Sequence, residues 1–341
     1  MMPRPQRACE LRLVAEAIQV LGATFVAILL LSVLTACTAS ALPRNMSLKA
    51  FDPHRPGFIC KHEADVNPPI TPEAYGLFQR GMAVTSYELM PDQRDYAKAA
   101  ELWKQAGAQG HWKAAMNLAG LYESGRGVPE DTEQAVLILE GLMKQGVPAA
   151  FDKIGTYHQR GIGVKGDTSR AYAFWQLAAD MGSSAAQAYL GEKTDATYDN
   201  PGQGFWGNRE VALKLLECSF AQGSKEAAYE LALTIGNREG NTEIQYARAR
   251  KIYQEGVKLC CTDCARDLSV SFALPEPLTG NTIDKARAAR YRELRDALEL
   301  NPDLRFPNLD KVLPLPPAEL PMWDGQRETL VNAAKGRATL P

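Results

Sequence analysis

The sequence lacks the short motifs that mark common enzyme classes. It contains no G-x-S-x-G nucleophile elbow, no Walker loop and no dinucleotide-binding fingerprint. Histidine is scarce, with 4 residues among 341, and none stands at motif spacing from a serine or cysteine. The formal net charge is only −2, and no basic cluster suggests nucleic acid. These absences argue against an enzyme, a cofactor-dependent protein and a nucleic-acid-binding protein.

What the sequence does contain is one pattern repeated every 36 residues. The two clearest copies read GHWKAAMNLAGLYESGRGVPEDTEQAVLILEGLMKQG and GVPAAFDKIGTYHQRGIGVKGDTSRAYAFWQLAADMG, and their end glycines are Gly110, Gly146 and Gly182. Small and aliphatic residues four apart predict two amphipathic helices in each copy, helix A and then helix B. One such hairpin cannot bury its apolar face alone, so neighbouring copies must stack. The period therefore predicts an all-α helical-hairpin solenoid.

The pattern continues in weaker form on both sides of these copies. An alanine of helix B recurs as Ala99, Ala135, Ala171, Ala212 and Ala249. This gives about five units in an α-solenoid over residues 71–300, with a charged last helix expected as its cap. We expect residues 37–70 to form a linker and lead-in, and the proline-rich tail 301–341 to pack on the solenoid. The tail side chains expected to be buried are Leu313, Leu315, Leu320 and Trp323.

The motif AAMNLAGLYESGRGVPED, followed by A-x₃-L and KQG, resembles the Sel-one-like repeat family, a relative of the tetratricopeptide repeat. The resemblance covers about two thirds of the chain. It implies a right-handed solenoid that acts as a binding scaffold. The third unit departs from the pattern, because its loop GEKTDATYDNPGQGFWGNRE has no GxGV and is longer.

The N-terminus has the features of a bacterial lipoprotein signal peptide. Three arginines precede the apolar run VLGATFVAILLLSVLTAC, which ends in a lipobox-like LTAC. The resemblance implies cleavage after residue 36 and lipidation of Cys37, and an uncleaved membrane anchor is the alternative. Because Thr38 rather than aspartate follows, the expected location is the outer membrane, facing the periplasm of the bacterial cell envelope.

Five cysteines remain after the leader and Cys37 are set aside. The disulfide candidates are Cys60, Cys218, Cys260, Cys261 and Cys264. An oxidising compartment favours disulfides, and an odd number leaves at least one thiol unpaired within the chain. The CCTDC cluster lacks the second CxxC or paired histidines of a zinc site, so no metal is predicted.

Two regions are candidates for partner binding. Helix A positions one residue before the buried aliphatic are expected to be exposed on the concave face, and they are Asn117, Lys153, Tyr189 and Glu230. The long loop at residues 192–208 adds Tyr198, Phe205 and Trp206, because aromatic side chains commonly anchor interfaces. The alternative is that this loop folds back on its own repeat.

The overall design resembles periplasmic immunity proteins that neutralise phospholipase effectors of type VI secretion. The resemblance implies a protein partner, a secreted phospholipase effector, and a membrane contact through the N-terminal lipid anchor. The alternative is a general envelope scaffold or adaptor lipoprotein that tethers other envelope proteins. A lipase-like gene beside this one would favour the first function.

Overall fold

The computed structural model describes residues 42–195, 207–237 and 240–337. The chain divides into two compact units, Met1–Met46 and Ser47–Pro341. The predicted leader and its cysteine lie outside the described residues. Among the residues that are described, no helix is both long and apolar enough to cross a membrane.

The described part of each unit is helical. The first unit contributes only the short 3-10 turn η1 at its end, and all other elements belong to the second unit. In chain order the elements are η1 (Pro43–Asn45), η2 (Glu63–Asp65), α3 (Pro72–Val84), η3 (Pro91–Gln93), α4 (Tyr96–Ala108), α5 (Trp112–Ser124), α6 (Thr132–Lys144), α7 (Pro148–Arg160), α8 (Thr168–Met181), α9 (Ser184–Asp195), α10 (Arg209–Ala221), α11 (Lys225–Gly236), α12 (Glu243–Lys258), α13 (Thr262–Ala273), η4 (Pro277–Thr279), α14 (Lys285–Leu300), α15 (Leu309–Val312) and α16 (Arg327–Ala334). The prediction of an all-α solenoid is confirmed.

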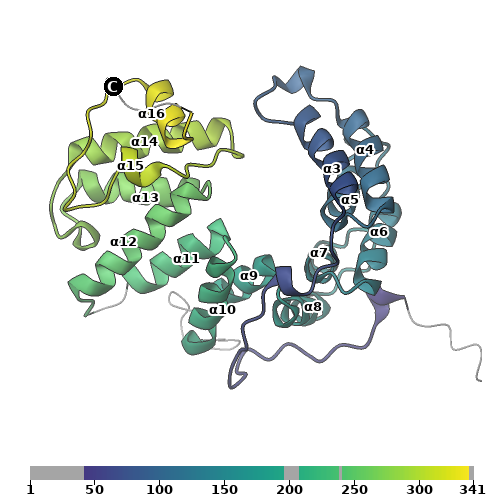
Figure 1. The fold of residues 1–341 in the computed structure, drawn as a ribbon. Helices are drawn as coiled ribbons and strands as arrows, with labels where there is room; N and C mark the ends of the chain where they lie inside the picture. Colours follow the sequence, from purple (N-terminus) through teal and green to yellow (C-terminus); the bar gives the residue numbers. More distant parts are fainter. Residues whose placement is uncertain (1–41, 196–206, 238–239, 338–341) are drawn as a thin grey trace, which may run out of the picture. The chain divides into compact units, whose positions relative to one another are not determined.

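Successive helices pair into hairpins, and each hairpin packs on the next (Figure 1). The pairs are α3 with α4, α5 with α6, α7 with α8, α9 with α10, α11 with α12, and α13 with α14. The sequence analysis counted about five units, whereas six hairpins are present in the described residues. The count differs because α14, expected as a cap, pairs with α13 as a full hairpin.

Helix B begins at a capping side chain in five of these hairpins. The cap is an aspartate or asparagine whose side chain accepts a hydrogen bond from the backbone N–H three residues on, and the caps are Asp95, Asp131, Asp167, Asn208 and Asp284. Such a cap satisfies an N–H group that has no partner inside the helix, and contributes about 1 kcal/mol.

The GxG loops of the second and third hairpins are needed for stacking. Gly127 has φ of +71°, and a Cβ there would lie 2.3 Å from the carbonyl carbon of Tyr96 at the start of α4. Gly163 has φ of +61°, and its Cβ would lie 2.7 Å from the carbonyl oxygen of Thr132 at the start of α6. Each loop therefore packs its bare backbone on the preceding helix B.

A glycine of helix A also receives a tryptophan of helix B in two hairpins. The Trp175 indole donates to the carbonyl of Asp152 at 3.2 Å, and a Cβ on Gly155 would meet its ring at 2.9 Å. In the first hairpin, Trp103 donates to a backbone carbonyl of α3 at 3.3 Å and packs on Gly81 in the same way. The small residues of helix A thus admit large side chains from helix B.

Residues 52–55 of the lead-in bind to helix α8. The backbone N–H of Asp52 donates to Gln176 Oε1 at 2.9 Å. The Arg55 guanidinium pairs with the Asp180 carboxylate at 2.8 Å. These contacts hold residues 52–55 along the third hairpin (Figure 1).

Farther on, the lead-in is joined to the fourth hairpin. Gln187 of α9 donates to the carbonyl of Lys61 at 3.0 Å. Cys60 forms a disulfide with Cys218 of α10. The lead-in therefore connects the third hairpin to the fourth through both hydrogen bonds and a covalent bond.

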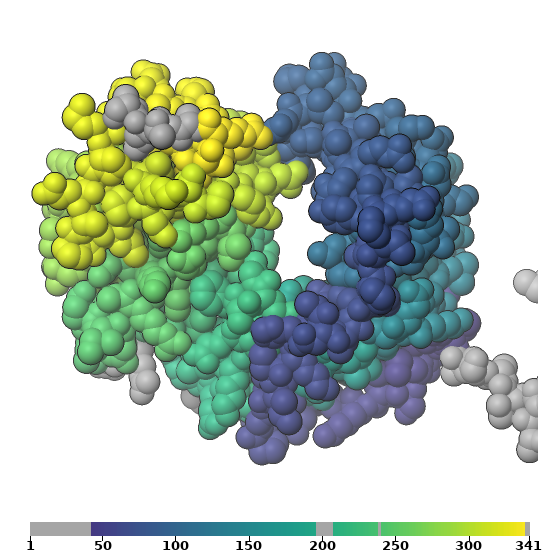
Figure 2. All heavy atoms as spheres, viewed as in Figure 1, coloured from purple at the N-terminus to yellow at the C-terminus, as the bar shows by residue number. Residues whose placement is uncertain are grey.

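The C-terminal tail packs on the last hairpins. Leu313 is buried in the same core as α11–α14, and Leu315, Leu320 and Trp323 are partly buried against that core. Figure 2 shows atoms of the segment beyond residue 300, in yellow, lying directly against the green helices before it. The tail also contains α15 and α16, which its proline-rich sequence did not predict.

Two arginines of α14 hold the tail in place. The Arg287 guanidinium donates to the carbonyl of Pro314 at 3.0 Å, and Arg290 donates to the carbonyl of Val312 at 2.7 Å. Both side chains are buried. Pro314, Pro316 and Pro317 lack the backbone N–H that a helix needs, so carbonyl groups of this stretch of the tail accept from arginine side chains instead.

Candidate functional site

The predicted helix A positions are less exposed than expected. Asn117, Lys153, Tyr189 and Glu230 are all half-buried. Lys153 pairs with the carboxylate of Glu123 at 2.8 Å. The expectation of exposure was wrong, because side chains of the neighbouring helices pack around these positions.

Two of the four positions come together in one pocket. The pocket has a volume of about 550 Å³ and lies across helix A of the last three hairpins, α9, α11 and α13. Tyr189 and Glu230 line it, whereas Asn117 and Lys153 do not. The complete lining is Ala185, Ala188, Tyr189, Glu192, Lys225, Glu226, Tyr229, Glu230, Cys261, Thr262 and Asp263. We call this the acidic pocket, because four carboxylates and one lysine line it.

The aromatic wall of the acidic pocket is fixed by stacking. The Tyr189 ring lies 4.5 Å from the Trp175 ring and 6.3 Å from the Tyr172 ring, measured between centroids. The hydroxyl of Tyr229 accepts a hydrogen bond from Arg266 at 3.2 Å. Burial raises the pKa of both tyrosines above its usual value, so both phenols stay neutral.

Glu230 has the least satisfied side chain of the acidic pocket. Glu192 pairs with Lys193 at 2.7 Å, and Asp263 pairs with Arg266 at 2.5 Å. Glu230 forms no ion pair or hydrogen bond with any residue that the structure describes. Burial, and then the neighbouring carboxylate of Glu192, raise the pKa of Glu230 to about 7. A cation beside Glu230 would relieve both effects.

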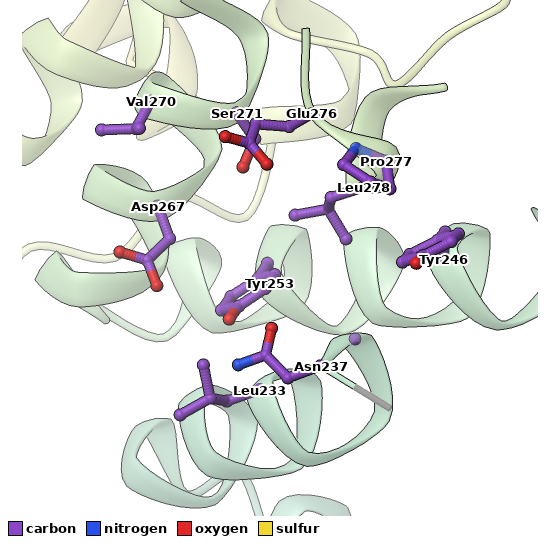
Figure 3. A pocket seen from close by; sticks show the side chains of 11 residues that line it. Leu233, Asn237, Tyr246, Tyr253, Asp267, Val270, Ser271, Glu276, Pro277 and Leu278 are labelled. Carbon is purple, nitrogen blue, oxygen red and sulfur yellow. The ribbon is translucent and has the colours of Figure 1, made fainter. Parts of the chain in front are cut away.

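A second pocket continues along α11 and α13. Its volume is about 670 Å³. In Figure 3 side chains from α11, α12, α13 and the η4 turn point into one space, with Tyr253 at its centre. The lining is Leu233, Gly236, Asn237, Tyr246, Tyr253, Asp267, Val270, Ser271, Glu276, Pro277 and Leu278. We call this the tyrosine pocket.

The two pockets adjoin along the same pair of helices. The Tyr229 ring of the acidic pocket lies 6.2 Å from the Tyr253 ring of the tyrosine pocket. On α13, Asp263 lines one pocket and Asp267, one turn later, lines the other. We call the continuous surface the α11/α13 groove. It is amphipathic: four carboxylates line the acidic pocket, whereas the tyrosine pocket combines the apolar side chains of Leu233, Val270 and Leu278 with two carboxylates, Asp267 and Glu276.

The other predicted binding residues cannot be compared with this groove. Tyr198, Phe205 and Trp206 lie outside the described residues, as does Cys37. Tyr229, Tyr253 and Asp263 were missed by sequence reasoning. The spacing of Glu226, Tyr229, Glu230 and Leu233 along one helix face was the available signal, but the sequence alone does not show which faces stay uncovered.

The cysteines in the described ranges form two pairs, Cys60–Cys218 and Cys261–Cys264. Cys260 is a buried free thiol. Within the described part of the chain, one group has donor atoms close enough for a metal ion, namely Cys60, His62 and Cys218, within 4.8 Å of one another. The disulfide uses both of its sulfur atoms, so this group offers a single imidazole to a metal.

Comparison with known proteins identifies the repeats. The sequence matches the Sel1 repeat at residues 78–111, 112–140 and 153–183. The solved structure of immunity protein Pa5087 from Pseudomonas aeruginosa is 30% identical, with a TM-score of 0.60, and the match covers 76% of this chain and 95% of that chain. The chain belongs to the Sel1-repeat family. Its C-terminal part, residues 275–338, also matches DUF6396, a domain of unknown function.

Two further structures from Pseudomonas aeruginosa are similar to this Sel1-repeat protein. Immunity protein PA5088 is 28% identical with a TM-score of 0.62, covering 77% of this chain and 95% of that chain. The protein PA5086 is 28% identical with a TM-score of 0.61, covering 77% and 96%. No protein with a curated description matches the sequence. The similarity extends over nearly the full length of each relative.

Proposed function

We propose that this Sel1-repeat protein is an immunity protein that binds a protein toxin and blocks it. The observation that carries the proposal is the similarity to Pa5087 and PA5088, both immunity proteins, over 95% of the length of each. The scaffold is non-enzymatic, and the α11/α13 groove supplies a surface for a protein partner. The toxin we propose is a secreted phospholipase effector of type VI secretion.

We also propose that the protein is a lipoprotein. The supporting observation is the charged leader and apolar run that end in LTAC at Cys37. The proposed location is the outer membrane, facing the periplasm, where an incoming toxin would be met. The two disulfides are compatible with an oxidising compartment of this kind.

Toxin protection tests the proposed function. A phospholipase effector encoded beside this gene would be expressed in the periplasm of a bacterial host, with and without this protein. We expect survival only with this protein, together with a complex of the two purified proteins in solution. Survival that does not change would contradict the immunity function, and co-isolation with other envelope proteins would then favour the scaffold function.

Membrane fractionation tests the anchor. Cys37→Ser removes the proposed lipidation site, so we expect the protein to leave the membrane fraction because acyl chains supply the anchoring energy. The matched control is Cys9→Ser, which changes a cysteine of the proposed leader and leaves the lipobox intact. Retention of the Cys37→Ser protein in the outer membrane would show that the lipoprotein proposal is wrong.

A further inference from the structure

The α11/α13 groove has two ends with different chemistry. At the acidic end, four carboxylate groups and one lysine line the pocket, and the carboxylate of Glu230 is half-buried among them; two further carboxylates, Asp267 and Glu276, line the tyrosine pocket. At the other end, the side chain of Val270 is 48% exposed and Tyr253 forms part of the wall. A ligand that fills the whole groove therefore needs a cationic group and an apolar group.

The length of the groove limits the ligand further. Glu226 and Asn237 mark its ends on α11, and at 1.5 Å per residue they are about 16 Å apart along the helix axis. An extended chain rises about 3.3 Å per residue, so roughly five residues span this distance. The groove thus matches a short extended peptide segment in length.

Glu230 is the residue that best distinguishes a cationic ligand from other ligands. Its neighbours Glu192 and Asp263 already have lysine or arginine partners within the chain. Glu230 forms no ion pair or hydrogen bond with any described residue, and the charge of Lys193 only partly offsets the rise of its pKa. An incoming ammonium or guanidinium group would therefore gain a full ion pair there. Opposite charges in a partly desolvated pocket attract more strongly than on an open surface.

We propose that the α11/α13 groove binds an extended segment of the protein partner, with a lysine or arginine beside Glu230 and an aliphatic or aromatic side chain in the tyrosine pocket. The inference rests on the proposed function for the identity of that partner, and on the groove alone for the chemistry of the segment. It places the recognised segment on a basic, amphipathic stretch of the toxin.

A defined peptide pair tests the groove without any toxin. The probe is a fluorescent peptide with one lysine, a spacer of three alanines and one tryptophan, and its control carries glutamate in place of lysine. Lysine and tryptophan are then about 13 Å apart in an extended chain, which matches the groove. We expect the lysine peptide to bind at least tenfold more tightly in fluorescence anisotropy. Equal binding of the two peptides would overturn the proposal.

Matched variants locate the two subsites. Glu230→Gln should reduce the preference for lysine, whereas Glu217→Gln, on the exposed surface of α10, should not. Val270→Glu should weaken binding of the lysine peptide at least fivefold. Leu137→Glu should not change this binding, because Leu137 is an apolar side chain of α6, outside the groove, with 47% exposure. Thermal unfolding of each variant checks that the fold is intact. Equal effects of a groove variant and its control would contradict the assignment.

The same variants separate this inference from the proposed function. If wild-type protein protects cells from the effector and Glu230→Gln and Val270→Glu protect equally well, the immunity function stands and the groove proposal is wrong. If the lysine peptide binds as expected but the effector does not, the groove proposal stands and the immunity function is wrong.

Discussion

The central hairpins and the last three hairpins use a carboxylate of helix A in different ways. In the central hairpins Glu123 pairs with Lys153 at 2.8 Å and accepts a hydrogen bond from the Tyr157 hydroxyl at 3.0 Å. In the last hairpins Glu230 has no such partner within the described residues, and its pKa is raised to about 7 by burial. The comparison indicates that the Glu123 carboxylate is satisfied within the protein, whereas the Glu230 carboxylate is left for a ligand.

The loops between helix A and helix B also differ between the two regions. The GxG loops of the second and third hairpins contact the neighbouring repeat, because Gly127 and Gly163 pack on the preceding helix B. The loop after α9 lacks this motif. Regular repeats therefore build the stack, and the departures from the repeat coincide with the part of the protein that carries the groove.

The largest loss of stability is expected when the disulfide between Cys60 and Cys218 is removed. This bond joins the lead-in to α10 and links residues that are 158 positions apart in the sequence. Cys60→Ser removes it at an exposed position, so little packing is lost. Because a disulfide across a long loop limits the unfolded chain, we expect a loss of about 2–5 kcal/mol in the free energy of unfolding by urea. Wild-type protein under reducing conditions loses both disulfides and should therefore be destabilised at least as much as Cys60→Ser. A variant as stable as the oxidised wild type would show that the lead-in is held by its hydrogen bonds alone.

A smaller effect is expected in the central stack, as the difference in stability between two glycine variants. Gly163→Ala places a Cβ 2.7 Å from a backbone oxygen of α6, at a left-handed φ of +61°. Gly161→Ala is the matched control, because its φ is +71° but the nearest atom would lie 3.9 Å away. The left-handed conformation alone costs about 1–2 kcal/mol, and overpacking adds about 1–3 kcal/mol. Equal stability losses in urea unfolding would show that the loop does not need the close approach.

The repeat core followed from the sequence because its physics is local and periodic. Leu118, Ile154 and Leu190 recur at intervals of 36 and are all buried. The cap positions and the left-handed glycines also follow from residue type. Cys260 illustrates the limit of this reasoning. It adopts φ of +69° where the earlier units have glycine, so the position keeps its conformation although the residue changes.

The groove could not be predicted because it depends on contacts between distant segments. Glu230 was singled out by its register, but whether it has a partner depends on α9 and α13, some 35 residues away on either side. The burial of Arg287 and Arg290 under the tail is equally non-local, since their acceptors are carbonyl groups of residues 312–321. Charge patterns along one helix cannot show such pairings.

Neutralising the two carboxylates tests the comparison directly. Glu123→Gln keeps the shape of the side chain and removes its charge, so the pair with Lys153 is lost. We expect a loss of about 1–2 kcal/mol in the free energy of unfolding at pH 7.5, because hydrogen bonds to charged groups contribute about 1.5–3 kcal/mol. Glu230→Gln should cause no loss under the same conditions. If Glu230→Gln is the more destabilising change, Glu230 has a structural partner and the contrast between the regions is wrong.

The smallest expected effect is a dependence of protein stability on pH, caused by Glu230 in the last three hairpins. The pKa of Glu230 is raised from 4.5 to about 7 in the folded protein, so between these values the folded state holds a proton that the unfolded state has released. The contribution of this carboxyl to stability is therefore fully present below about pH 4.5 and is lost as the pH rises through about 7. Glu230→Gln cannot titrate, so its melting temperature relative to wild type should rise between pH 5 and pH 8. Glu217→Gln, at an exposed position of α10, is measured beside it as the control variant. A constant difference for Glu230→Gln would mean that its carboxylate is already stabilised in the free protein, which would leave no unmet charge for a cationic partner.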